Sequence, residues 1–544
     1  MDIEELQPEQ LAAEDATYWM HLKDIKVDGR TFDLKGRAYQ QEIMRPVTAD
    51  GKFKHNEVIR KGTQIGVTMC KVAEATHGAL YGMYPQGIIF YFPNQKAVEI
   101  FSQSRFKPFV MDNPEEVKKY IDGVDNVTMR RIGSTHVYFF GGGATVRVGG
   151  DRKDSTYVRS TSADWVILDE RPLFDPEMAD QVNQRLGNSK IERRTDMGSP
   201  KIPESDVDLL YRKSDQRRWQ IKCDSCGKYT CAETEYPGCI AVKDGIGYLV
   251  CVHCGKAISA NNGSWQPDFP DRDLVGYWAS QLINPNCNHA RILKKDEDPK
   301  AFGISRAEFQ RTVLGLPYLG ADDALTEADV FNCCRDNNPM AYSDNGPCAM
   351  GVDVGNPLYA VIGHRMGDKR FRVIKACRVP DWNALHDLYV RFNVRSCVID
   401  AQPEYHKVRE FQKAHGNVHL CYYSEHIKTF DNWNAQDNII NVNRTEIFDA
   451  TADMCRKEGC LELPRVNEEL KIFAHQMTRA VRVLETDTRG NKLYRYRARG
   501  DKEDHYRNAM NYFYLACKRV GVPEGVAKNK RRPVMQDTSY KLGA

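Results

Sequence analysis

The most informative segment of the chain reads Val58-Ile59-Arg60-Lys61-Gly62-Thr63-Gln64-Ile65-Gly66-Val67-Thr68. Its apolar opening predicts a strand, its glycines a tight turn, and the pattern that follows an amphipathic helix. Such a turn aims backbone N–H groups and a helix N-terminus at an anion, as phosphates require. Val67 replaces the lysine that usually precedes the Ser/Thr of a phosphate-binding loop, but Lys61 stands at the start of this loop. We expect Lys61 to fold back onto the phosphates and Thr68 to hold Mg²⁺; an ordinary strand–turn–helix is the alternative.

A second segment, Trp165-Val166-Ile167-Leu168-Asp169-Glu170, supports the first. Four apolar residues predict a buried strand, and two carboxylates follow at its C-terminal end, where ligand sites of α/β proteins form. In a phosphate-binding-loop enzyme Asp169 would hold Mg²⁺ and Glu170 would polarise the attacking water. A buried strand that ends in Asp-Glu is common by chance, so the pair of motifs together predicts an ATPase.

Two cysteine motifs, Cys223-Asp224-Ser225-Cys226-Gly227-Lys228 and Cys251-Val252-His253-Cys254-Gly255-Lys256, predict a zinc site. A spacing of two residues lets both thiolates of a pair reach one ion, and the glycine permits the tight turn after it. Four thiolates (Cys223, Cys226, Cys251 and Cys254) would close a tetrahedral structural Zn²⁺ site. Four free buried thiols, or a site that also uses Cys231, Cys239 or His253, are the alternatives.

Three acids in the C-terminal half stand where a nuclease would need them. Asp353 lies in the apolar strand Met350–Gly355, Asp400 ends the strand Val398–Asp400, and Asp504 opens a helix over 506–519. Acids from separate elements that converge on two Mg²⁺ or Mn²⁺ ions are the design of ribonuclease H-like enzymes. Each acid alone is weak support, because Asp504 also suits a helix N-terminus and Asp400 a loop. Glu404 or Glu503 are alternatives for a member of the trio, and the third position is the least secure.

Composition limits the class of protein. The chain has 544 residues with 41% hydrophobic side chains, which excludes a largely disordered chain and suggests roughly three or four domains. Its 77 basic and 74 acidic residues give a net charge of +3, which excludes a uniformly basic nucleic-acid coat protein but leaves local basic patches. No apolar run approaches the ~20 residues of a membrane-spanning helix, and the acidic N-terminus argues against a secretory signal. Seventeen cysteines in such an intracellular chain favour metal binding and buried thiols over disulfides.

The predicted fold class is α/β, with strands alternating with helices in both halves. Candidate strands of the first half are Asn56–Arg60, Gly87–Phe92, His136–Phe140 and Trp165–Leu168. We expect a helical lead-in over 1–35, a P-loop ATPase domain with a parallel sheet over 36–215, a zinc-binding module over 216–270, a linker region over 271–344, a ribonuclease H-like α/β nuclease domain over 345–520 and a flexible basic tail over 521–544.

Several of these motifs resemble those of phage terminase large subunits of the lambda-like type. The segment Lys61–Thr68 is similar to their deviant phosphate-binding loop, whose lysine also stands at its start. Tyr39-Gln40-Gln41-Glu42 resembles their adenine-side motif, with Tyr39 to stack and Gln40 to hydrogen-bond. Gly198-Ser199-Pro200 resembles the motif that couples hydrolysis to DNA movement. Further similar segments are Pro93–Gln95, Arg105–Pro108, Tyr157–Ser160 and Asp215–Trp219, the last leading directly into Cys223.

The resemblance implies an ATPase motor that threads phage DNA into a procapsid and a nuclease that cuts it. It implies ATP, Mg²⁺ or Mn²⁺ and Zn²⁺ as cofactors, and Asp353, Asp400 and Asp504 as nuclease metal ligands, with His505 assisting. Implied partners are double-stranded DNA, a small terminase subunit, the portal protein of the procapsid and other copies of the chain in a ring, in the host cytoplasm and with no membrane. Residues implied at the nucleotide are Tyr39, Gln40, Lys61, Gly62, Gln64, Gly66, Val67, Thr68 and Asp169, with Glu170 catalytic.

Which arginine reaches the γ-phosphate is open. Arg60, Arg105, Arg159 and Arg185 are candidates, and Arg159 is preferred for its place in its motif. Two rival functions remain as well. One is another enzyme, a helicase–nuclease or a transposase-like protein. The other is a zinc-bearing DNA-binding structural protein whose loop has lost its activity. Strand joining would favour the transposase, and ATP turnover would exclude the structural protein.

Overall fold

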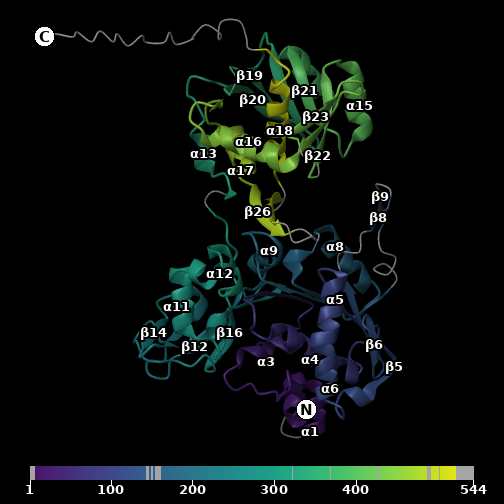
Figure 1. The fold of residues 1–544 in the computed structure, drawn as a ribbon, viewed down its shortest axis with the longest axis vertical. Helices are drawn as coiled ribbons and strands as arrows, with labels where there is room; N and C mark the ends of the chain where they lie inside the picture. The colour runs from purple at the N-terminus through teal and green to yellow at the C-terminus, as the bar shows by residue number, and fades with distance from the viewer. Residues whose placement is uncertain are drawn as a thin grey trace, which may run out of the picture. The chain divides into compact units, whose positions relative to one another are not determined.

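The computed structural model describes residues 7–141, 146–148, 151–153, 161–174, 176–320, 323–367, 369–425, 427, 429–486, 492–500 and 503–521. The expected basic tail therefore lies, from residue 522 on, outside the described residues. The chain divides into two compact units, Met1–Leu319 and Gly320–Ala544 (Figure 1). Each has its own sheet and its own core, so each is described by itself. No helix among the described residues has the length and apolar character to cross a membrane.

The first unit is built on an eleven-stranded sheet whose centre is parallel. Its order runs β13 (Tyr229–Cys231), β12 (Arg217–Lys222), β17 (Val275–Ala279), β3 (Asn56–Lys61), β11 (Arg193–Gly198), β10 (Trp165–Asp169), β4 (Ile88–Phe92), β7 (Thr135–Gly141), β6 (Met129–Ile132) and β5 (Ile121–Asp125), with β16 (Gly263–Pro267) paired to β12. Short two-stranded pairs are β1 (Lys26–Val27) with β2 (Arg30–Thr31), β8 (Val146–Val148) with β9 (Asp151–Lys153), and β14 (Ile240–Lys243) with β15 (Ile246–Leu249).

The central strands are buried on both faces. Every residue of β4 and β10 is buried, as expected of a parallel sheet covered by helices on each side. The four strands predicted from the sequence are all present, as β3, β4, β7 and β10, and the α/β fold class is confirmed. Residues 275–279, in the segment expected to be a linker region, form β17, which pairs in parallel with β3.

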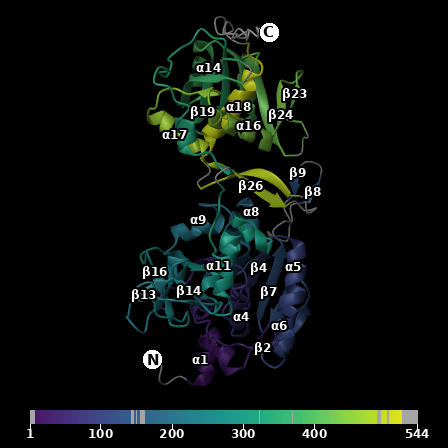
Figure 2. The same ribbon diagram turned by 60° about the vertical axis from the view of Figure 1, so that its left-hand side comes forward.

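Helices surround this sheet (Figures 1 and 2). The lead-in folds as two short helices, and α4 follows the loop after β3 directly. The helices of the unit are α1 (Pro8–Glu14), α2 (Ala16–Leu22), α3 (Tyr39–Ile43), α4 (Val67–Leu80), α5 (Gln95–Phe101), α6 (Lys107–Asp112), α8 (Pro176–Gln181), α9 (Asp206–Lys213), α10 (Ala232–Glu235), α11 (His289–Glu297) and α12 (Arg306–Thr312).

The second unit carries an eight-stranded mixed sheet. Its order is β23 (Asp431–Asn434), β24 (Ile439–Asn443), β22 (Val418–Ser424), β21 (Val394–Asp400), β18 (Cys348–Asp353), β19 (Leu358–Arg365), β20 (Phe371–Val379) and β25 (Leu461–Glu462), with β26 (Ala480–Thr486) and β27 (Lys492–Ala498) as a separate hairpin. Its helices are α13 (Glu327–Phe331), α14 (Trp382–Arg391), α15 (Tyr405–Ala414), α16 (Arg444–Arg456), α17 (Glu468–Met477) and α18 (His505–Cys517).

The last helix, α18, packs closely on the middle of this sheet, against β18, β19 and β21. A Cβ atom on Gly351 would lie 2.0 Å from the backbone nitrogen of Phe513, so only glycine permits this approach. The close packing brings the start of α18 to the ends of β18 and β21. The three acids predicted from the sequence lie at these positions: Asp504 at the start of α18, Asp353 at the end of β18 and Asp400 at the end of β21.

Candidate functional site

The loop between β3 and α4 has the backbone of an anion-binding turn. Gly66 caps α4 in the left-handed region at φ 82°, and Gln64 is also left-handed at φ 60°. Val67 is the first residue of α4, so the helix N-terminus opens at the loop as the sequence predicts.

Four predicted residues of the nucleotide site come together at this loop. The Nζ atom of Lys61 lies 2.6 Å from Oε1 of Glu170 and 3.9 Å from Oδ1 of Asp169. Thr68 donates its hydroxyl to Oδ2 of Asp169 at 3.1 Å. The side chains of Lys61, Thr68, Asp169 and Glu170 thus lie together at the C-terminal edge of the sheet.

Burial and the neighbouring charges act against each other at this point. Burial raises the pKa of Asp169 to about 6; the charge of Glu170 adds to the rise and Lys61 opposes it. Burial alone would lower the pKa of Lys61, but Glu170 and Asp169 outweigh it and raise that pKa. A buried cation beside two acids and a hydroxyl provides the charges that triphosphate and Mg²⁺ need, so these residues fit both groups.

Tyr39 and Gln40 hydrogen-bond to the backbone of the loop. The Tyr39 hydroxyl and the Gln40 side-chain amide both donate to the carbonyl oxygen of Ile65, each at 2.9 Å. Tyr39 is only 1% exposed and its ring packs edge-on against Trp219. The Tyr39 ring is therefore not free to stack on a base in this structure, and its adenine role stays a prediction.

The loop is also braced by residues that sequence reasoning missed. Thr63 donates its backbone N–H to the carbonyl of Thr312 at 2.7 Å, and Gln281 donates its amide to the carbonyl of Thr63 at 3.0 Å. A Cβ atom on Gly62 would lie 2.9 Å from the backbone oxygens of Thr312 and Val313. These braces come from the segment expected to be a linker, and nothing in its sequence distinguishes them.

Three of the four arginine candidates are engaged elsewhere. Arg60 is buried, pairs with Asp208 at 2.7 Å and lies against the rings of Tyr211 and Trp278. Exposed Arg105 lies 3.2 Å from Asp28. Arg185 is buried near Tyr91; burial raises the pKa of the Tyr91 hydroxyl, and the charge of Arg185 opposes that rise. Arg159 lies outside the described residues, so its role stays a prediction.

The segment expected to couple hydrolysis to movement packs against Glu170. A Cβ atom on Gly198 would lie 2.6 Å from the Pro172 ring and 3.2 Å from Cα of Glu170. The backbone N–H of Ser199 faces Oε2 of Glu170 at 3.5 Å. Glu170 itself is left-handed, at φ 56°. Displacement of Glu170 would therefore be felt directly by this turn.

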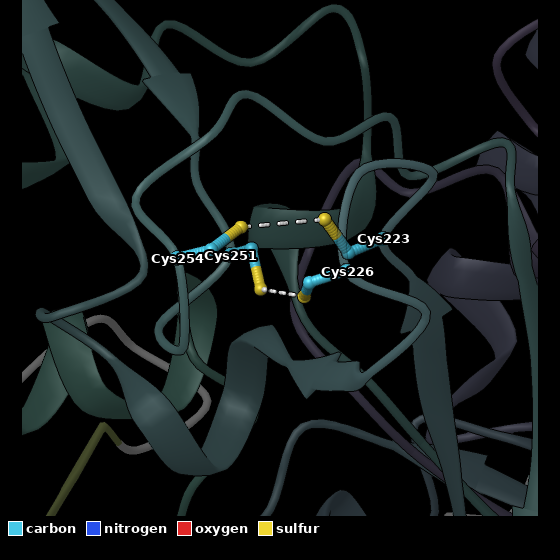
Figure 3. Close-up of side chains that lie close together, drawn as sticks. All are labelled: Cys223, Cys226, Cys251 and Cys254. Atoms are coloured by element: carbon cyan, nitrogen blue, oxygen red, sulfur yellow. Dashed lines mark hydrogen bonds between the residues drawn. The ribbon is translucent and has the colours of Figure 1, made fainter.

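The four predicted zinc ligands form one cluster (Figure 3). Their sulfur atoms all lie within 4.8 Å of one another, and the pairs Cys223–Cys254 and Cys226–Cys251 are each 3.7 Å apart. In Figure 3 Cys223 and Cys226 lie on one turn and face Cys251 and Cys254 on the other. Sulfurs about 2.3 Å from a central Zn²⁺ would be separated by about this distance, so the donor set fits the ion.

The backbone also favours a thiolate in this cluster. Burial raises the pKa of Cys251, but the backbone amides of His253 and Cys254 outweigh it, and the pKa is about 6. The backbone amide of Lys228 lowers the pKa of Cys226, but desolvation and the three neighbouring thiols outweigh it and raise that pKa to about 11. Because the thiolate is the form that binds metal, a cation would displace the proton of Cys226. His253 contacts the carbonyl of Tyr229 at 3.2 Å instead of joining the sulfurs.

The three acids of the second unit meet at one edge of its sheet. Asp353 ends β18 and Asp400 ends β21, and these strands are parallel neighbours with Val352 opposite Ile399. Asp504 immediately precedes α18, which packs on both strands. Their ligand atoms do not all lie within 4.8 Å of one another, in contrast to the cysteines.

His505 joins this group through Asp353. Its Nδ1 atom lies 2.8 Å from Oδ2 of Asp353, and its ring stacks on Tyr359 with centroids 4.5 Å apart. Asp400 accepts a hydrogen bond from the backbone N–H of Gln402 at 3.1 Å, and the nearby Tyr512 hydroxyl lowers the pKa of Asp400 against the effect of burial. Tyr359 and Tyr512 are further residues of the site that no motif in the sequence indicated.

Burial raises the pKa of all three acids. That of Asp353 is about 7, and the charges of Asp400 and Asp504 add to burial while His505 opposes it. That of Asp400 is about 6, and that of Asp504 is also raised. Buried carboxylates that repel one another are oxygen donors short of positive charge, which suits hard cations such as Mg²⁺ or Mn²⁺.

The alternative acids are placed differently. Glu404 accepts a hydrogen bond from the Trp382 indole at 3.0 Å, and Glu503 is exposed. Asn508, one turn after Asp504, accepts a hydrogen bond from Tyr423 at 3.1 Å.

Comparison with known proteins finds a family model that matches part of the first unit. Residues 31–268 match the family model described as the phage terminase large subunit gpA, ATPase domain. Over this segment the chain is similar to the ATPase domain of phage terminase large subunits. The matched segment contains the loop, the Asp169–Glu170 pair and all four clustered cysteines, and the resemblance expected from the motifs is confirmed.

One solved terminase shares the fold. The HK97 bacteriophage large terminase is 12% identical, with 92% of this chain and 98% of that chain covered and a TM-score of 0.52. Weaker matches are the large terminase of a thermophilic bacteriophage (12% identity, 87% and 97% coverage, TM-score 0.31) and the magnesium-bound large terminase nuclease of the thermophilic phage G20c (15%, 36% and 98%, 0.24). No curated protein sequence matches the chain. At such low identity the HK97 likeness establishes the fold alone, over both units.

Proposed function

We propose that the first unit is an ATP-driven DNA-translocating motor and the second a metal-dependent DNA endonuclease. The observation that carries the motor assignment is the convergence of Lys61, Thr68, Asp169 and Glu170 inside the segment that matches terminase ATPase domains. In this terminase Lys61 binds the β- and γ-phosphates, and Thr68 with Asp169 holds Mg²⁺. Gly62, Gln64, Gly66 and Val67 present backbone N–H groups to the phosphates.

Glu170 polarises the attacking water once Lys61 turns to the phosphates. Bound Mg²⁺ supplies charge neutralisation on the transferred phosphoryl group. Because Gly198 packs on Glu170, a change in the position of Glu170 passes to the turn at Ser199 and Pro200. Arg159 is proposed as the arginine that reaches the γ-phosphate.

In the second unit Asp353, Asp400 and Asp504 would hold Mg²⁺ or Mn²⁺. Such ions would supply the positive charge that activates an attacking water and stabilises the leaving oxygen of a phosphodiester. His505 orients Asp353 through the 2.8 Å contact. In the first unit, Cys223, Cys226, Cys251 and Cys254 would hold a structural Zn²⁺ with no open position.

Proposed partners are double-stranded DNA, a small terminase subunit, the procapsid portal and other copies of the chain in a ring. The family supports these partners, and the proposed place of action is the portal, in the host cytoplasm. The proposal that Arg159 completes the ATP site depends on the assignment of the nucleotide site to the loop at Lys61–Thr68.

The test is cleavage of supercoiled plasmid with Mg²⁺ or Mn²⁺, with DNA-stimulated ATPase measured in the same samples. We expect Asp353→Ala to lose cleavage and keep ATP turnover, and Glu170→Gln to do the reverse. If the wild type neither cuts nor hydrolyses ATP, the zinc-bearing DNA-binding protein is the better account. Strand joining in place of cleavage would favour the transposase-like enzyme.

A further inference from the structure

A second group of metal-ligand side chains lies in the second unit, outside the acid trio. Asp344, Cys348 and His364 each offer a ligand atom, and these three atoms all lie within 4.8 Å of one another. Asp344 belongs to the segment before β18, Cys348 is the first residue of β18, and His364 is near the end of β19. We propose that Asp344, Cys348 and His364 form a second transition-metal site, of the kind that takes Zn²⁺.

The strand register explains why two of these side chains meet. Strands β18 and β19 are antiparallel, with Ala349 opposite Gly363, so Cys348 and His364 are the next positions along the pair. Side chains directly across an antiparallel pair stand on the same face, with Cβ atoms about 5 Å apart. The carboxylate of Asp344 then closes over both.

The distances are those of ligands around an ion. Oδ2 of Asp344 is 3.3 Å from Nε2 of His364, and its other oxygen, Oδ1, is 3.6 Å from Sγ of Cys348. The same Sγ atom is 3.9 Å from Nδ1 of His364. Donors about 2.0–2.3 Å from a tetrahedral Zn²⁺ would be separated by about 3.3–3.8 Å. A shorter imidazole–carboxylate contact in the same unit, from Nδ1 of His505 to Oδ2 of Asp353, measures 2.8 Å. The cysteine cluster of the first unit shows the longer spacing too, at 3.7 Å.

The surroundings support a metal ligand at His364. Its Nδ1 atom lies 3.2 Å from the carbonyl oxygen of Pro347, which orients the ring and leaves Nε2 facing Asp344. A backbone carbonyl on the second ring nitrogen is the usual support of a metal-bound histidine. Asp344 is held in turn by the backbone N–H of Gly346 at 2.7 Å.

Burial and ligand type together limit which metal ion the site would bind. Cys348 is fully buried and His364 is 9% exposed, while the Asp344 side chain is 30% exposed. One thiolate, one imidazole and one carboxylate select a borderline divalent ion such as Zn²⁺ over Mg²⁺ or Ca²⁺. Three protein ligands leave a fourth position, which the exposure of Asp344 opens to water.

This site is separate from the acid trio. Cys348 and Asp353 stand at opposite ends of β18, about 16 Å apart at the usual rise per residue. A metal at Cys348 would fasten residues 344–348 to β19 and so fix the start of the strand that carries Asp353.

The experiment is the zinc content of the purified full-length chain after dialysis. We expect two equivalents in the wild type and one in Cys348→Ser, with Cys226→Ser also losing one, from the cysteine cluster. Cys377→Ser removes a thiol of the same unit outside both groups and keeps two. If Cys348→Ser fails to fold, Asp344→Asn, which changes a partly exposed side chain, tests the same site.

Cobalt gives an independent readout. In Co²⁺-loaded protein, Cys348→Ser removes the sulfur-to-cobalt absorption of one thiolate, whereas Asp344→Asn lowers Co²⁺ affinity. A wild type with a single zinc that Cys226→Ser removes would overturn the proposal. A metal content that neither Cys348→Ser nor Asp344→Asn changes would overturn it equally.

Discussion

The Nζ atom of Lys61 lies 2.6 Å from Oε1 of Glu170, which joins the start of the phosphate-binding loop to the acid after β10. The lysine is buried, whereas the Glu170 side chain is 36% exposed, so solvent screens this pair in part. Glu170 and the phosphates of a bound nucleotide would therefore compete for Lys61. Phosphate that attracts Lys61 also frees Glu170.

Glu170→Gln removes the charge of this acid and keeps its shape. We expect ATP turnover to fall by about 10²–10⁴-fold, because the amide cannot polarise the attacking water. ATP binding should survive, because Lys61 and Thr68 are unchanged. Turnover and equilibrium nucleotide binding, measured on the same protein, check this. Loss of both together would mean that Glu170 holds the loop and not the water.

Gly62→Ala tests the brace behind the loop. A Cβ atom there would stand 2.9 Å from two backbone oxygens, those of Thr312 and Val313, which cannot move without shifting the segment. We expect weaker ATP binding and unchanged plasmid cleavage. Gly416→Ala is the matched control, because its Cβ would meet nothing within 4 Å. Normal ATP affinity in Gly62→Ala would show that the brace is not needed.

Local sequence was sufficient to predict the elements that carry motifs. Strands β3 and β10 follow from short apolar runs, and the tight turn at Gly66 follows from its glycine. The acids Asp353 and Asp400 follow from their place at the ends of apolar strands. In each case a few neighbouring residues determine the local structure.

Long-range pairing could not be predicted in the same way. Strand β17 reaches the centre of the first sheet from a segment whose sequence looks like a connection, because its partner β3 lies more than 200 residues earlier. The same holds for Gln281 and Thr312 at the loop, and for Tyr359 against His505. Such contacts depend on the register of distant strands, which no local pattern contains.

Cys226→Ser tests the zinc cluster of the first unit. Cys226 is exposed, so serine changes the ligand set without disturbing a core. We expect loss of one zinc and a lower unfolding temperature, because β12 runs directly into Cys223 and pairs with β17. Cys287→Ser, a partly exposed thiol outside the cluster, should change neither quantity. Unchanged stability after zinc loss would argue that the ion is not structural.

The pH dependence of cleavage should follow the buried acids. A pKa of about 7 means that Asp353 is largely protonated at pH 6 and ionised at pH 8. Only the carboxylate binds Mg²⁺, so at limiting Mg²⁺ cleavage should rise with pH through about 7. At saturating Mg²⁺ the midpoint should move to lower pH, because the metal competes with the proton. A midpoint that does not depend on Mg²⁺ would place the titrating group outside the metal site.

Asp353→Asn should also stabilise the metal-free chain at high pH. The pKa of Asp353 is raised from 3.8 when unfolded to about 7 when folded, so ionisation favours the unfolded state. The resulting loss of stability is absent below pH 3.8 and grows as pH rises to about 7. Asparagine cannot ionise and avoids it, so its advantage in unfolding temperature should be full at pH 8 and small at pH 4. Asp387→Asn, at an exposed position on α14, controls for the loss of one charge. Equal unfolding temperatures for Asp353→Asn and wild type at pH 8, in the presence of a chelator, would show that Asp353 is not strained by its burial.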